Sequence, residues 1–199
     1  MRGRGEPSRL AMYLGDIPFE DERITYDEFL KRREQLPYGQ LPVLDIDDGR
    51  LVVAQSMSIL RYLGSLTGLY PTNDALLAFK IDEIFGPIDD FLGSIGPSFH
   101  EQDPEKQRAM RQEMEREAIP GFFSKLDQRI AARGAPFATG ASLTVADLAI
   151  YGVIGFLRHG ELPHVSPKVV DQFPHLVAIY DKVAMLPKVQ EWNATRQSK

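Results

Sequence analysis

The apolar positions of the chain follow a strand pattern in one short stretch and a helical pattern over most of the remaining length. Residues 41–54 hold two apolar runs, LPVLDI and LVVA, separated by an Asp-Asp-Gly-Arg turn. Asp48-Gly49 is typical of a tight hairpin turn, because such turns need positive φ angles. We therefore predict a β-hairpin in this stretch.

A helix is predicted directly after the hairpin, from about residue 56 to residue 67, with Gly68 closing it. Its apolar face consists of Met57, Leu60 and Leu63. Ser56 suits the N-cap position, where its hydroxyl would accept from the first free N–H groups of the helix. Those N–H groups and the helix dipole also make a ready site for a carboxylate or a phosphate.

Three further elements are predicted before the hairpin. Pro7 is well placed near the start of a helix that ends at Gly15. Residues 17–24 alternate well enough for a short strand, and residues 27–35 predict a short charged helix or an irregular turn. The part of the chain up to residue 68 is thus a small α/β unit.

Strand signals end at residues 69–73, LYPTN, which are the best candidate for a linker. Residues 74–99 have apolar positions at helical spacing, although Gly86-Pro87 should bend that helix. Asp103-Pro104 begins a second long helix that reaches about Arg133. Two shorter helices are predicted near the end, over residues 174–185 and 188–195.

Between these long and short helices, Thr144-Val145-Ala146-Asp147 forms a Thr-x-x-Asp capping box before the almost wholly apolar run LAIYGVIGFL. A helix that is apolar on every side belongs in a domain core. The predicted fold is an α/β domain over residues 1–68, a linker over 69–73 and an all-helical domain over 74–199.

The composition excludes several classes of function. The 199 residues are 43% hydrophobic and 26% charged, with a net charge of -5, which argues against a general nucleic-acid binder. No apolar run approaches the roughly 18 residues of a membrane span, so a cytoplasmic protein is expected. The absence of cysteine excludes disulfides and cysteine nucleophiles, and four scattered histidines lack metal-site spacing, so we predict no metal.

A hairpin turn and a serine cap alone usually mark only the ends of strands and helices and indicate no function. Together with the Arg-Gly-Arg-x-Glu opening, Leu-Pro-Val-Leu, Gln55-Ser56 and the capping box, however, the chain resembles the cytosolic glutathione transferases over essentially its whole length. The nearest pattern is the sigma-like, or haematopoietic prostaglandin D synthase-like, branch. The resemblance implies a thioredoxin-like N-terminal domain, a helical C-terminal domain and glutathione as co-substrate.

The resemblance also implies which residues bind glutathione. Ser56 and the helix behind it would hold the γ-glutamyl carboxylate, and Gln55 would add side-chain hydrogen bonds. The backbone of Leu41 would pair with the cysteinyl unit like one more strand, next to a cis Pro42.

The two ends of glutathione would be bound by residues outside the hairpin. Arg33 and Gln40 fall where the family binds the glycyl carboxylate, and Phe29 falls where sigma-like members usually have Trp. Asp90 matches the acidic residue that reaches into the neighbouring subunit, although it would equally suit the solvated face of a long helix. If the match holds, the functional unit is a homodimer.

The thiol must be activated, since the thiolate is the nucleophile. In tyrosine-type transferases a tyrosine at the end of the first strand donates to the sulfur, a few residues before Arg-Gly-Arg. That strand and tyrosine are absent from this sequence, which starts at Met1. Arg4 and the start of the first helix would remain near the sulfur, and both favour a thiolate.

Without its first strand the predicted sheet is incomplete and leaves unpaired edges. Either the natural chain begins upstream of Met1, which we expect, or this chain seals the sheet in another way.

The second substrate would be a small hydrophobic molecule between Gly3 and two helical segments. By resemblance, the lining residues on these segments are Leu92, Phe99, Ala149 and Val153. The predicted function is transfer of the glutathione thiolate to apolar electrophiles, as in detoxification. A glutathione-dependent isomerase is a close variant, and a non-catalytic carrier or crystallin-like relative is the rival.

Overall fold

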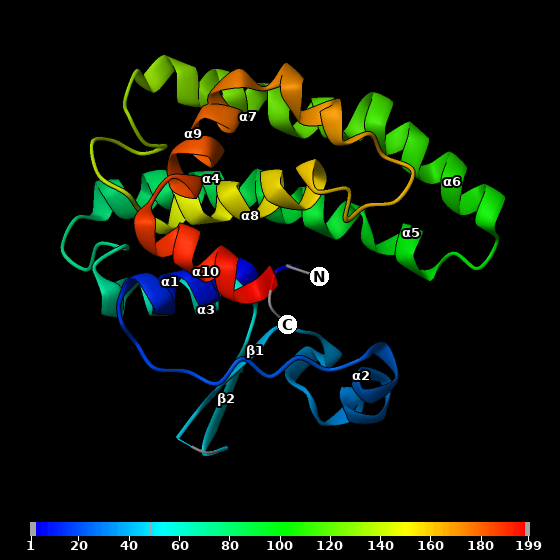
Figure 1. Ribbon diagram of the computed structural model, residues 1–199, viewed down its shortest axis with the longest axis horizontal. Helices are drawn as coiled ribbons and strands as arrows, with labels where there is room; N and C mark the ends of the chain where they lie inside the picture. Colours follow the sequence, from blue (N-terminus) through cyan, green and yellow to red (C-terminus); the bar gives the residue numbers. More distant parts are fainter. Residues whose placement is uncertain (1–2, 48, 198–199) are drawn as a thin grey trace.

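The first third of the chain contains a hairpin and three helices. The structure is a computed structural model that describes residues 3–47 and 49–197 (Figure 1). Helix α1 spans Glu6–Leu14, α2 spans Tyr26–Arg32, and two 3₁₀ turns, Arg33–Gln35 and Pro37–Gly39, lead into the hairpin. Strands β1, Val43–Ile46, and β2, Leu51–Ala54, are followed by α3, Ser56–Thr67.

The rest of the described chain is helical. Its elements are α4, Ala75–Ser94; α5, Gly96–His100; α6, Pro104–Glu113; a π-helical turn, Met114–Ala118; α7, Ile119–Arg133; α8, Val145–Arg158; a 3₁₀ turn, Pro167–Gln172; α9, Pro174–Ala184; and α10, Pro187–Gln197. This arrangement agrees with the predicted fold class. None of the helices in the described ranges has the length and apolar character that crossing a bilayer requires.

The hairpin forms where the sequence predicts it. Strands β1 and β2 are antiparallel, with Val43 opposite Ala54 and Ile46 opposite Leu51. Gly49 has φ 87°, and its N–H donates to the Asp45 carboxylate at 2.6 Å. Asp48, the other half of the predicted turn signal, lies outside the described residues. The glycine therefore supplies the positive φ angle that the turn needs.

The predicted strand over residues 17–24 is wrong. This segment has extended, irregular backbone, and residues 18–24 make no backbone–backbone hydrogen bond within the described part of the chain. A strand is defined by its ladder to a neighbour, and the described sheet contains β1 and β2 alone. Side chains hold the segment instead, through the Arg9–Asp21 ion pair at 2.6 Å.

The long helix predicted over residues 74–99 is present as α4, which continues through Pro87 and ends at Ser94, and α5 follows after Ile95. The bend at Gly86-Pro87 stays a prediction. The short helix α5 then turns toward α6. Buried side chains on both sides of Pro87 explain the continuity, because Ile84 and Ile88 fix the helix against the core.

Arg111 of α6 fixes α5 in place. The Arg111 side chain is 2% exposed and donates to the Ser98 hydroxyl and carbonyl oxygens and to the Pro163 carbonyl oxygen. Burial lowers the pKa of its guanidinium. The π-helical turn follows directly, and α6, this turn and α7 run on as one long rod that agrees with the helix predicted from Asp103-Pro104 to Arg133.

Helix α8 is the centre of the molecule. Its residues from Val145 to Leu157 are all buried, and the helix packs against α1, α3, α4 and α9 (Figure 1). The predicted capping box is present. The Asp147 carboxylate accepts from the Thr144 N–H at 2.8 Å, from the Thr144 hydroxyl at 3.0 Å and from the Ala138 N–H at 2.7 Å. Burial raises the pKa of Asp147, and these hydrogen bonds oppose the rise.

We predict that Asp147→Ala costs about 2–4 kcal/mol of unfolding free energy, because it leaves buried donors without an acceptor at the start of the central helix. The matched control is Glu28→Ala, which removes the acid at the equivalent N3 position of the exposed capping box of α2. Chemical denaturation should give a much smaller loss for the control. Equal losses for the two variants would contradict the central role of α8.

Candidate functional site

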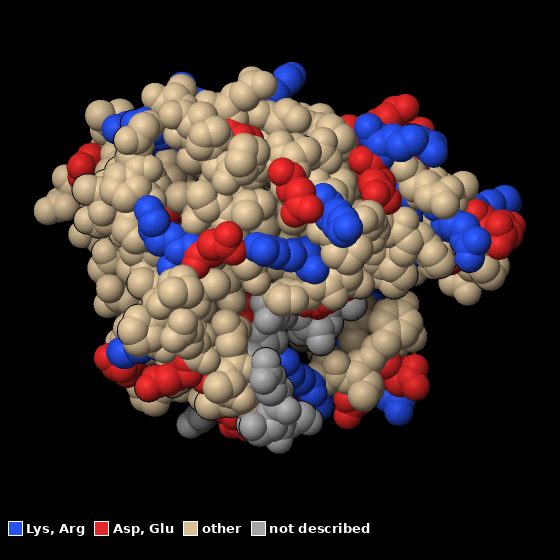
Figure 2. Space-filling view, turned by 45° about the horizontal axis from the view of Figure 1, so that its top comes forward, with Lys and Arg blue, Asp and Glu red and all other residues tan. Residues whose placement is uncertain are grey.

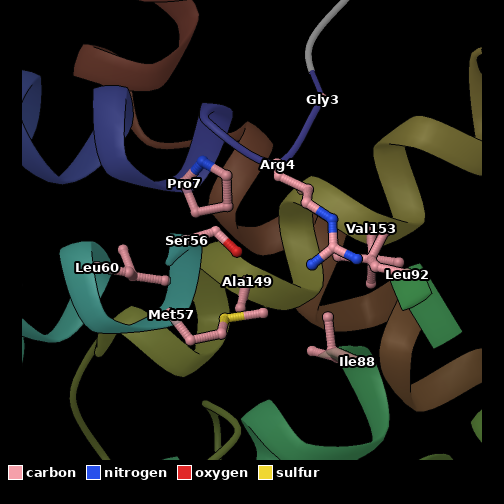
Figure 3. A pocket seen from close by; sticks show the side chains of 11 residues that line it. Gly3, Arg4, Pro7, Ser56, Met57, Leu60, Ile88, Leu92, Ala149 and Val153 are labelled. Carbon is pink, nitrogen blue, oxygen red and sulfur yellow. The ribbon is translucent and has the colours of Figure 1, made fainter. Parts of the chain in front are cut away.

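A small crevice lies where α1, α3, α4 and α8 meet (Figure 3). Its cavity volume is about 20 Å³, and about 320 Å³ of space free of atoms lies in and around it when open solvent is included. Its lining is mostly apolar and consists of Gly3, Arg4, Pro7, Ser56, Met57, Leu60, Ile88, Leu92, Ala149, Gly152 and Val153. The crevice therefore joins residues predicted for both substrates: Arg4 and Ser56 on one side, and Gly3, Leu92, Ala149 and Val153 on the other.

Arg4 brings the positive charge of this site. Its Nη1 atom is 2.6 Å from Oδ1 of Asp89, and the two side chains are 33% and 50% exposed. An ion pair this open to solvent adds little stability, about 0–1 kcal/mol. Its effect is on position, since Asp89 draws the guanidinium toward α4. Figure 3 shows the Arg4 guanidinium and the Ser56 hydroxyl pointing toward the middle of the crevice.

Ser56 is buried, but not as the N-cap that the sequence suggested. It is the first residue of α3, and the cap position belongs to Gln55, which has φ 74° and ψ 105°. The Gln55 side chain is exposed and does not cap the helix within the described structure. The first N–H groups of α3 are therefore left to water or to a ligand.

The Leu41-Pro42 peptide bond is cis, as the resemblance implied. Leu41 is 40% exposed and precedes β1, and no hydrogen bond from its backbone is found in the described ranges. Its N–H and C=O are thus available to an extended ligand.

The predicted glycyl-end residues lie along one connection. Phe29 belongs to α2, Arg33 begins the first 3₁₀ turn, and Gln40 follows the second. Gly39 has φ 58°, and the Arg33 side chain lies against it, one residue before Gln40. Arg33 and Gln40 are exposed and Phe29 is half-buried. None of the three lines the crevice.

Two other predicted residues also lie outside the crevice lining. Asp90 is exposed on α4, and no ion pair of its carboxylate is found within residues 3–47 and 49–197. Phe99 is 41% exposed on α5, with the Arg111 guanidinium 4.8 Å from its ring centre.

Sequence reasoning missed several parts of the site. Asp89, which the sequence did not single out, pairs with Arg4. The lining residues that were not predicted are Pro7, Met57, Leu60, Ile88 and Gly152. The helical periodicity marked Met57 and Leu60 as a buried face, but periodicity does not separate core from cavity wall.

Acidic and basic side chains are interspersed on the described part of the face in Figure 2, without a continuous basic surface there. Nor do the described residues gather three His, Asp or Glu side chains into a potential metal site. What the geometry offers is an apolar crevice with one cation, one buried hydroxyl and a helix start.

Comparison with known proteins assigns the family. A family profile described as "Glutathione S-transferase, C-terminal domain" matches residues 89–196. Hematopoietic prostaglandin D synthase from Homo sapiens is 31% identical over 192 residues, which cover 96% of this chain and 90% of the relative. The chain belongs to the glutathione transferase family.

Further similarities agree with this assignment. Glutathione S-transferase 1 from Ascaris suum is 28% identical over 206 residues, covering 98% of this chain and 93% of the relative. The structure of prostaglandin synthase D from Nilaparvata lugens has a TM-score of 0.86 at 30% identity and covers 98% of this chain and 94% of that one. The resemblance to the prostaglandin D synthase-like branch of the glutathione transferases is confirmed.

In this glutathione transferase family member we predict that Gly152→Ala destabilises the crevice wall. A Cβ atom at Gly152 would lie 2.9 Å from Cγ of Pro7, a rigid ring on α1, so α1 and α8 must separate. The expected cost is about 1–3 kcal/mol of unfolding free energy, measured by chemical denaturation. In the control Gly121→Ala, the new Cβ meets nothing within 4 Å, and we expect a gain of about 0.5–1 kcal/mol. A neutral Gly152→Ala would contradict the tight contact.

Proposed function

We propose that this protein binds glutathione, stabilises its thiolate and transfers the sulfur to small hydrophobic electrophiles. The observation that carries the proposal is the crevice itself. Its apolar walls from α4 and α8 face Arg4 and Ser56, which lie at the starts of α1 and α3. A hydrophobic electrophile and a bound thiol would therefore lie side by side.

The polar side of the crevice suits an anionic peptide. Glutathione carries two carboxylates, one ammonium and one thiol. Ser56 and the open N–H groups of α3 would hold the γ-glutamyl carboxylate, with Gln55 beside them. The free backbone of Leu41 would pair with the cysteinyl unit, and Arg33 and Gln40 would bind the glycyl carboxylate, with Phe29 next to them.

The positive charge near the sulfur would come from Arg4 and the N-terminus of α1. A thiol with its usual pKa near 8.5 is mostly protonated at pH 7, so a nearby cation raises the thiolate fraction. The Asp89 carboxylate 2.6 Å from Arg4 moderates that charge. Tyrosine is absent from the lining of the crevice in the described structure, which leaves Arg4 as the catalytic group we propose.

The electrophile would contact Leu92, Ala149 and Val153 directly, with Gly3 at the opening. Phe99 lies on α5, the short helix that follows α4, and we propose it as an outer contact for longer substrates. We also propose a cytoplasmic location, because glutathione is abundant in that compartment.

A glutathione-dependent isomerase is the second candidate. It is favoured by relatives named prostaglandin D synthase, which are 30–31% identical to this chain. An isomerase uses the same thiolate but returns it, so product forms without consumption of free thiol. A transferase consumes one thiol for each product formed.

We predict that Ser56→Ala weakens glutathione binding by about tenfold, because the γ-glutamyl carboxylate loses a buried hydrogen-bond donor. Isothermal titration calorimetry measures the change. The matched control is Ser58→Ala, which removes an exposed hydroxyl from the same helix two residues later and should leave the Kd unchanged.

The same proteins decide between enzyme and carrier. Retention on immobilised glutathione with conjugation of a reactive aryl halide supports the transferase, and retention without turnover identifies a non-catalytic carrier. A wild-type protein that does not bind glutathione would refute the proposed function.

We further propose that the protein is a homodimer through α3 and α4. These helices are joined by the Arg61–Asp82 ion pair at 2.7 Å, and both expose large apolar side chains. The exposed fractions are 43% for Tyr62, 57% for Leu66, 63% for Leu76 and 62% for Phe79. Clustered exposed apolar residues mark interfaces. Asp90, on the same helix α4, would then reach the ammonium of glutathione in the partner subunit.

We predict that Phe79→Glu converts the dimer to a monomer, because it would bury an unpaired charge in the interface. Sedimentation equilibrium gives the mass. Met185→Glu is the control, since Met185 is 71% exposed at the end of α9 and belongs to neither α3 nor α4, and it should leave the mass at that of the dimer. A wild-type monomer would rule out the interface.

A further inference from the structure

The C-terminal helix α10 is tied to the start of α1 by a buried hydrogen bond. Trp192 is the single tryptophan of the sequence and is 9% exposed. Its indole Nε1–H donates to Oε1 of Glu6 at 3.0 Å. Glu6 is fully buried in the first turn of α1, although carboxylates are almost never fully buried unless paired. This contact spans the chain from its first helix to its last.

Aromatic contacts hold the Trp192 indole in place. The Trp192 ring lies 5.2 Å from the ring of Tyr13 and 5.9 Å from that of Phe19, measured between centroids. Tyr13 belongs to α1, and Phe19 belongs to the irregular segment that follows it. Trp192 therefore fixes both α1 and the segment that lacks a strand partner in the described sheet.

The Glu6 carboxylate extends the link into a chain of charges. Its Oε2 atom is 3.5 Å from Arg9, and Arg9 is 2.6 Å from Asp21. Asp21 is also bound by Arg23 at 2.7 Å. The connection that leads toward α2 is thus anchored to the same carboxylate as α10.

Arg4 lies two residues before Glu6, in the turn that opens α1. The Glu6 N–H donates to the Gly3 carbonyl oxygen at 3.3 Å, and the Arg9 N–H donates to the Gly5 carbonyl oxygen at 3.1 Å. A shift of Glu6 therefore moves the backbone that carries Arg4. The Asp89 partner on α4 restrains only the tip of that side chain.

We propose that Trp192 and Glu6 are positioning residues, through which α10 sets the place of the Arg4 guanidinium in the crevice. The inference rests on the proposed function, in which Arg4 stabilises the glutathione thiolate. A docking role alone does not require a buried carboxylate, because apolar residues of similar size pack two helices at least as well. The hydrogen bond from Trp192 to Glu6 has a fixed direction, so it also sets the position of α1 relative to α10.

The test compares Trp192→Phe with Lys188→Met. W192F keeps an aromatic ring beside Tyr13 and Phe19 but removes the indole donor. K188M removes another link between α10 and α1, at the far end of α1, where Lys188 contacts Asp16 at 2.6 Å and the Leu14 carbonyl oxygen at 3.3 Å. Arg4→Gln, alone and combined with W192F, completes the set.

The first readout is the pKa of the thiol of bound glutathione, from the ultraviolet absorbance of the thiolate against pH. We expect W192F to raise this pKa by about 0.5–1. K188M should leave it unchanged, R4Q should raise it further, and W192F should add nothing in the R4Q background. An unchanged pKa in W192F, or an equal effect of W192F with and without Arg4, would overturn the inference.

The second readout is amide hydrogen exchange of the unliganded protein. We expect faster exchange over residues 5–9 in W192F and over residues 13–17 in K188M. If the wild-type protein does not lower the thiol pKa, the thiolate role in the proposed function fails. The positioning role is then judged on exchange alone, where equal rates over residues 5–9 in W192F and wild type would overturn it.

Discussion

The burial of α8 over all but its last residue is the constraint on which the rest of this structure depends. Thirteen consecutive residues, from Val145 to Leu157, are hidden from solvent, so every neighbouring helix must fit the surface that α8 presents. The Asp147 capping box makes this burial tolerable, because it supplies an acceptor where the helix starts in the protein interior. Gly152 lets α1 approach closely, with Pro7 against the α8 backbone. The position of α1 is thus set by a helix near the other end of the sequence.

The candidate site follows from that packing. Helix α1 lies on α8, and α3 lies beside both, so two helix starts meet over an apolar floor. Arg4 and Ser56 provide polar chemistry at those starts, and Ala149 and Val153 of α8 form part of the floor. Polar helix starts and an apolar floor therefore lie side by side in one crevice. The family assignment gives this arrangement its chemical meaning.

Much of the architecture could be predicted from the sequence, because its signals are local. Gly49 in the hairpin turn, Gly68 after α3 and the Thr144–Asp147 box each fix a boundary with nearby atoms. The failures involve partners that are distant in sequence. The 17–24 segment has the alternation of a strand but no partner strand in the described sheet. At the site, Arg4, Ser56 and four apolar wall residues were predicted through the family resemblance. Asp89 and Gly152 were not, because Asp89 contacts Arg4 across 85 residues of sequence and Gly152 contacts Pro7 across 145.

The π-helical turn at Met114–Ala118 has a consequence for how this chain is aligned with other proteins. Such a turn accommodates one residue more than a regular α-helix, and each residue of an α-helix rotates the following side chains by about 100°. The π-helical turn absorbs this extra residue, so that Arg111 faces α5 while Phe123, further along the same rod, faces the core. A homologue shorter by one residue here would have a regular α-helix, in which the residues before and after the turn keep the same faces. In this segment, a one-residue gap in an alignment therefore represents the loss of the π-helical turn rather than a rotated helix or a lost loop residue.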